Sequence, residues 1–191
     1  MSLASVLRFD VTEGRIEAKP LGRVVLLPEN VFRALFRSSK EQQDLESMRA
    51  LGDACGAFAR DSLSQTSAEH DVAEIAPEIV FRALRESVAL VGLGKLEGEQ
   101  WGSAMILKLS GSVALDAESL GIGAFLGGVL RTLSGYEVAA VPVGPGHYFV
   151  VHPSIADEVW SLAKRGLSLG DIVLRLESEH LSVDSAEIQL D

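Results

Sequence analysis

Two segments whose apolar residues recur at helical spacing also contain glycines, and this combination restricts how the chain can pack. In the first segment Gly52 and Gly56 lie one turn apart beside the apolar face. Each glycine inside a helix costs about 1 kcal/mol relative to alanine. We therefore expect another backbone or a ligand to approach both helices closely. The glycines of the second segment are Gly121, Gly123, Gly127 and Gly128.

The second glycine set also resembles a dinucleotide-binding loop, but its position does not suit that role. The first glycine of such a loop occupies the turn between strand and helix, where the phosphates meet the helix N-terminus. Here residues 116–120 intervene and already have helical spacing. The acidic residue expected at the end of the next strand is also missing. Tight packing of this helix against a sheet or another helix is the favoured interpretation.

The order of the expected elements indicates the fold class. Runs of like elements, rather than strict alternation of strand and helix, favour an α+β fold with an antiparallel sheet. We expect about four strands with helices packed on one face, plus an N-terminal hairpin. The expected elements are strands at 6–9, 15–18 and 24–27, helices at 29–36, 45–62 and 72–88, strands at 104–109 and 111–115, a helix at 118–134, a hairpin at 136–151 and a helix at 155–165.

The sequence also indicates how several of these segments begin or end. The helix at 72–88 either begins near Pro77 or kinks there. Ser154 and Asp157 are spaced as a variant capping box for the helix at 155–165. The segment 167–176 is rich in apolar residues but has no clear type, and 178–191 is expected to be an acidic, disordered tail. Residues 1–177 are predicted to form a single α+β domain.

Charge and composition exclude several classes of function. The chain of 191 residues has 17 basic and 27 acidic side chains, a net charge of −10. Binding of nucleic acid or of an anionic membrane would need a basic surface, so neither is expected. No stretch reaches 18 apolar residues, and residues 1–10 do not have the pattern of a signal peptide. We therefore expect a cytoplasmic protein without a transmembrane segment.

No complete catalytic or metal-binding motif is present. Cys55 is the sole cysteine, which excludes an internal disulfide and a cysteine-rich zinc site. It lies on the apolar face of its helix, where a thiol is usually inert. His147 and His152 are five residues apart on an expected strand and so face opposite sides. We predict no catalytic residues, no metal site, and no cofactor other than a non-covalent lipophilic ligand.

Three stretches of the chain resemble a known family. They are Leu21–Pro28 (LGRVVLLP), Ala50–Phe58 (ALGDACGAF), and Gly121–Gly135 (GIGAFLGGVLRTLSG) with the hairpin at 136–151 behind it. Their pattern over about 22–151 is similar to that of a 4-vinyl reductase-like domain, the bacterial relative of the small core subunits of TRAPP vesicle-tethering complexes.

The resemblance implies a fold and a type of ligand. It implies helices on one face of a four-stranded antiparallel sheet, dimerisation through the helical layer, and an apolar cavity for an acyl chain or another hydrophobic ligand. Many members of the vinyl reductase-like family have cysteines in the late strands, and some TRAPP core subunits have a lipidated cysteine just after the first long helix. Residues 141–151 and 64–71 contain none, which argues against metal binding and covalent acylation.

These observations predict a non-enzymatic dimeric scaffold or binding protein with an apolar ligand pocket. Its partner is expected to be a second copy or a related subunit. One alternative is an enzyme or accessory factor that acts on a tetrapyrrole or another lipophilic substrate, with His147 or Tyr148 as acid or base. Another is a scaffold that regulates a small GTPase. The residues expected at a ligand site or, slightly favoured, at a dimer seam are Leu51, Gly52, Cys55, Gly56, Phe58, Gly123, Gly127 and Gly128.

Overall fold

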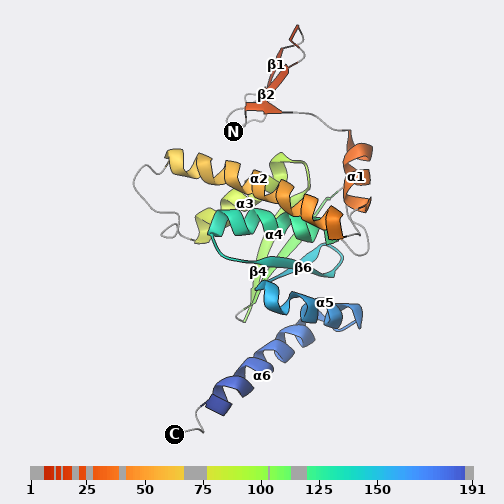
Figure 1. Ribbon diagram of the computed structural model, residues 1–191, viewed down its shortest axis with the longest axis vertical. Coiled ribbons are helices and arrows are strands. Elements are labelled where there is room, and N and C mark those ends of the chain that lie inside the picture. Colours follow the sequence, from red (N-terminus) through yellow and green to blue (C-terminus); the bar gives the residue numbers. More distant parts are fainter. Residues whose placement is uncertain are drawn as a thin grey trace.

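The computed structural model describes residues 7–10, 12–13, 15–18, 22–24, 28–38, 42–66, 77–102, 104–112 and 120–187 (Figure 1). The N-terminal part is a three-stranded antiparallel sheet of β1 (Leu7–Asp10), β2 (Arg15–Ala18) and β3 (Gly22–Val24). The expected N-terminal hairpin is therefore present, and β3 pairs with its second strand. The Asp10 carboxylate accepts hydrogen bonds from the backbone N–H groups of Thr12 and Glu13, which closes the first turn. Residues 25–27 of the expected third strand lie outside the described residues.

Four helices follow the N-terminal sheet: α1 (Glu29–Ser38), α2 (Gln42–Thr66), α3 (Pro77–Leu90) and α4 (Leu120–Ser134). Helices α2, α3 and α4 contribute to the core on one face of the main sheet. Helix α3 is described from Pro77 onward. Proline suits the first helical turn because its missing N–H would have no partner there. The expected helical residues 72–76 lie outside the described part of the chain.

The main sheet has four strands in the order β4-β5-β7-β6, and all neighbours are antiparallel. They are β4 (Lys95–Trp101), β5 (Ala104–Ser110), β6 (Ala139–Gly144) and β7 (His147–Val151). The β6–β7 hairpin confirms the expectation from Gly144-Pro145-Gly146. β5, however, pairs with β4 and β7. Of the expected strand at 111–115, Gly111 and Ser112 are not in a strand, and residues 113–115 lie outside the described residues. β4 is a polar edge strand that contains a glycine, so its sequence lacks a clear strand pattern.

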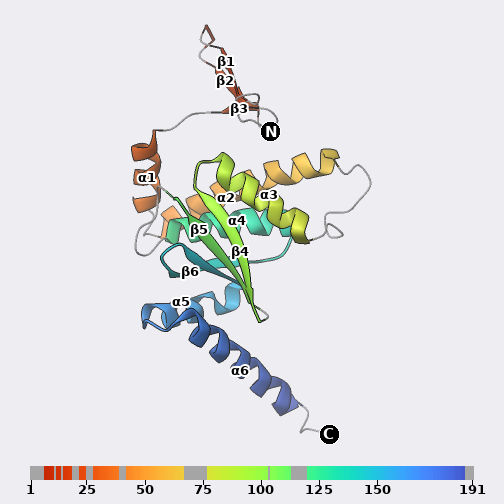
Figure 2. The same cartoon turned by 180° about the vertical axis from the view of Figure 1, so that it is seen from behind.

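The two faces of this sheet are covered by different helices (Figure 2). Successive side chains of a strand point to opposite faces. On β5, Leu107 and Leu109 therefore pack with α2, α3 and α4, whereas Ile106 packs with the C-terminal helices α5 (Ala156–Lys164) and α6 (Leu169–Glu187). The structure confirms the α+β class with helices packed on one face, and it adds α5 and α6 on the other.

The start of α5 differs from expectation. The predicted capping box of Ser154 and Asp157 does not form, and Ile155 precedes the helix without a side-chain cap. Instead, Pro153–Ile155 forms a short 3-10 turn. The His152 Nδ1 atom accepts the Ser154 backbone N–H over 3.3 Å.

Helix α6 continues past residue 177, the expected end of the domain. It continues to Glu187, through most of the segment expected to be a disordered tail. A capping box does occur here: the Asp171 N–H donates to the Ser168 hydroxyl, and the Ser168 N–H donates to the Asp171 carboxylate. Among the described residues, no helix combines the length and apolarity needed to cross a bilayer.

Candidate functional site

The glycines of α2 and α4 lie where these two helices meet. A β-carbon at Gly52 would collide with the backbone carbonyl of Phe125, and one at Gly128 would lie 2.9 Å from the Asp53 nitrogen. A β-carbon at Gly56 would lie 2.8 Å from the Val129 carbonyl oxygen. Since real β-carbons do not approach backbone atoms so closely, only glycine allows this spacing of the helices. The close approach of another backbone is therefore confirmed at these positions.

A polar contact joins the same two helices. The Arg131 guanidinium donates to one Asp53 carboxylate oxygen over 2.7 Å, and the Thr132 hydroxyl donates to the other over 3.2 Å. Asp53 follows Gly52 directly, so the close approach of the backbones brings its carboxylate within reach of α4. Glycine packing and ion pairing thus act on one helix–helix contact.

The remaining predicted site residues are distributed over several environments. A β-carbon at Gly123 would collide with the Ala140 carbonyl of β6, whereas at Gly127 the nearest atoms would be 3.5 Å away. Cys55 and Phe58 are half-buried, and the Leu51 side chain is 43% exposed on the outer side of α2. Their role in a ligand site or a dimer seam stays a prediction, and none of the eight residues lines the groove described next.

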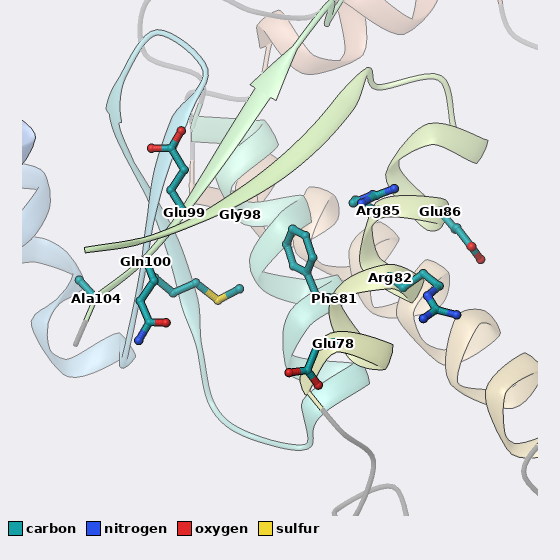
Figure 3. Close-up of a pocket in the computed structure, with 10 residues that line it drawn as sticks. Glu78, Phe81, Arg82, Arg85, Glu86, Gly98, Glu99, Gln100 and Ala104 are labelled. Carbon is teal, nitrogen blue, oxygen red and sulfur yellow. The ribbon is translucent and has the colours of Figure 1, made fainter. Parts of the chain in front are cut away.

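A groove of about 820 Å³ lies between α3 and the hairpin of β4 and β5 (Figure 3). The sequence does not indicate this groove, because β4, which forms one of its walls, lacks the alternating pattern of a half-buried strand. The residues that line it come from three separate elements: Glu78, Phe81, Arg82, Arg85 and Glu86 of α3; Gly98, Glu99 and Gln100 of β4; and Ala104 and Met105 of β5.

The apolar part of the groove depends on the register of the hairpin. Gly98 pairs with Leu107, and Gln100 pairs with Met105. Paired residues, and residues two apart on one strand, lie on the same face of the sheet, so all four positions face α3. Phe81 points from α3 toward β4 in Figure 3, and a β-carbon at Gly98 would lie only 2.8 Å from its ring. Gly98 thus allows the ring to lie directly on the strand.

Polar groups surround this apolar part. The Gln100 amide group donates a hydrogen bond to the Gly102 carbonyl over 3.3 Å at the end of the hairpin. Arg82 and Glu86 extend from α3 away from the strands and form the outer rim (Figure 3). Glu97 of the same strand is not among the lining residues; a hydrogen bond from Lys95, together with the charges of Lys95, Lys108 and Arg85, lowers its pKa. The groove therefore combines an apolar floor with a charged rim.

The residues considered for catalysis or metal binding lie elsewhere. Tyr148 is fully buried, and the His147 Nδ1 atom contacts the Pro145 carbonyl oxygen at 2.9 Å. Neither residue lines the groove. Within the described ranges no three histidine, cysteine, aspartate or glutamate side chains are grouped as metal ligands. Burial raises the pKa of the Cys55 thiol above its ordinary value.

Comparisons with known proteins give a likeness of fold. No protein-family model matches the chain, and no curated protein matches it. A solved structure, the phenol-responsive sensory domain of the transcription activator PoxR in complex with phenol, superposes with a TM-score of 0.57 at 14% sequence identity. The superposition covers 88% of this chain and 93% of that domain. This chain therefore has the same overall fold as that sensory domain.

Proposed function

We propose that the chain is a non-enzymatic domain that binds a small lipophilic molecule in the groove between α3 and the β4–β5 hairpin. The groove itself carries this proposal. Its volume of about 820 Å³ lies within the range of small-molecule sites, which is roughly 300–1,000 Å³. Such sites are mostly apolar and contain a few polar groups that orient the ligand.

The lining residues suggest how a ligand is held. The Phe81 ring and the Met105 side chain offer an aromatic and a polarizable surface to the apolar part of the ligand. The Gln100 amide can donate to or accept from a polar group on the ligand. Met105 is 36% exposed, so a bound molecule would cover apolar surface that now faces solvent.

The fold supports this proposal and suggests the first probes. The similar sensory domain was solved with phenol, a small aromatic molecule with one hydroxyl group. A ring of this kind would contact Phe81 while its hydroxyl group bonds to Gln100. The resemblance of residues 22–151 to a 4-vinyl reductase-like domain also implies a hydrophobic ligand. On that resemblance we further propose that two copies of the chain form a homodimer through the helical layer.

Titration calorimetry with phenol and 1-naphthol tests the ligand site. Phe81→Ala and Met105→Ala should each weaken binding about fivefold or more, since about 1 kcal/mol of apolar contact corresponds to that factor. Val31→Ala is the matched control, because Val31 is also an exposed apolar side chain but lies on α1, outside the groove lining. Equal losses in all three variants, or no binding of either probe at millimolar concentration, would contradict the proposed site.

The two alternative functions gain no support from the described geometry. An enzyme acting on a tetrapyrrole would need acid or base groups beside its substrate. Tyr148 is fully buried, and His147 lies outside the groove lining. The GTPase-regulating scaffold rests on the family resemblance and on the net charge of −10 alone. Both remain hypotheses.

A further inference from the structure

The end of the β4–β5 hairpin lies between the groove and helix α6. Gln100 and Met105 face α3 on one side of the hairpin, and Trp101 alternates to the other side. There the Trp101 ring lies close to Gly170, whose β-carbon position would be 4.0 Å from the ring atom Cζ3. Figures 1 and 2 both show this end of the hairpin beside α6. The same few residues thus form a groove wall and a contact with α6.

A continuous chain of contacts leads from the groove to α6. Gln100 lines the groove and donates to the Gly102 carbonyl over 3.3 Å. Gly102 has a φ of +61°, and a β-carbon there would collide with the Glu177 carboxylate of α6. The amide of Gln100 therefore holds the turn at the point where the turn touches Glu177.

Trp101 connects the same two elements a second time. Its indole N–H donates to the Glu99 carboxylate over 3.3 Å, and Glu99 is also a groove residue. Its ring reaches α6 two helical turns before Glu177. The hairpin end thus contacts α6 at two points, Gly170 and Glu177.

We propose that this hairpin end transmits occupancy of the groove to α6. The inference rests on the proposed ligand site and adds its regulation. A ligand whose polar group accepts a hydrogen bond from the Gln100 amide competes with the Gly102 carbonyl for the N–H groups of that amide. Without that bond, the turn at Gly102 can move relative to Glu177 of α6. The ligand therefore stabilises a second arrangement of the hairpin end and α6. A ligand shifts such an equilibrium only through contacts that differ between the two arrangements, and the Gln100 bond is such a contact.

A first experiment needs no ligand. Hydrogen–deuterium exchange of the α6 backbone amides is measured in the full chain for the wild type, for Gln100→Ala and for Glu86→Ala. Glu86 also lines the groove, but it belongs to α3 and serves as the matched control. Gln100→Ala should speed exchange near residues 170–177 severalfold, because the turn loses its hydrogen bond. Glu86→Ala should leave it unchanged, and unchanged exchange in Gln100→Ala would overturn the transmission.

A second experiment uses phenol in the Trp160→Phe variant, because 1-naphthol emits in the same range as tryptophan. The chain has two tryptophans, so Trp101 becomes the single tryptophan. Saturating probe should shift the Trp101 emission and alter exchange in α6. Glu177→Ala should retain the affinity for the probe within twofold but lose the exchange response.

The outcomes separate the two proposals. Binding by calorimetry without any response of α6, or a full response in Glu177→Ala, would overturn the transmission and leave the ligand site intact. Absence of binding would contradict the ligand site, and the ligand-free experiment would then still decide whether the hairpin end controls α6.

Discussion

At Gly123 a methyl group would collide with the Ala140 carbonyl, whereas at Gly127, one turn later, it would make ordinary contacts at 3.5 Å. Gly123 and Gly127, two of the four glycines of α4, should therefore respond in opposite ways to substitution by alanine. Gly123→Ala should lower the free energy of unfolding by about 1–3 kcal/mol through overpacking. Gly127→Ala should raise it by up to about 1 kcal/mol through helix propensity. Urea unfolding of both variants measures these changes, and equal effects would contradict the packing described here.

The Cys55 thiol should react slowly with alkylating reagents. Burial raises its pKa, so at a given pH a smaller fraction is the reactive thiolate than in an exposed cysteine. The rate of modification by iodoacetamide at pH 8 should lie well below that of the same chain in urea, which is the control. Equal rates in the folded and unfolded chain would show that Cys55 is accessible and has an ordinary pKa.

At the scale of elements, the Asp53–Arg131 ion pair should stabilise the contact of α2 with α4 only modestly. The pair joins the helices over 2.7 Å but is partly exposed, so solvent screens it. A double-mutant cycle of Asp53→Ala and Arg131→Ala should give a coupling energy of about 0.5–1 kcal/mol. The coupling should decrease in 1 M salt. A coupling near zero would show that the ion pair does not stabilise the helix contact, which would then depend on glycine packing and on the Thr132–Asp53 hydrogen bond.

Local sequence signals predicted some elements well and others poorly. The β6–β7 hairpin was evident from Gly144-Pro145-Gly146. The sequence does not indicate β4, because a polar edge strand with a glycine lacks the alternation of a half-buried strand. Sequence spacing predicts a capping box at Ser154 and Asp157, but Ser168 and Asp171 form it. Both pairs have the same spacing, and only the path of the chain decides which pair meets.

At the scale of the whole molecule, the predicted dimer is tested by the outer face of α2. Leu51 is exposed there, and in a dimer through the helical layer it would be covered. Sedimentation velocity should show a dimer for the wild type and a monomer for Leu51→Arg. Tyr136→Arg is the control, because Tyr136 is 71% exposed after α4 and should leave the dimer intact. A monomeric wild type would refute the predicted dimer.

The sequence by itself determined the α+β class, the order of most elements and the close packing of the glycine-bearing helices. These features depend on short-range periodicity and on the absence of a β-carbon, which single segments reveal. Only the tertiary structure decided that α5 and α6 cover the second face of the sheet, and that a groove lies between α3 and the β4–β5 hairpin. The groove brings Phe81 close to Gly98 and Met105. A local sequence pattern cannot predict which of two distant segments will pack against each other.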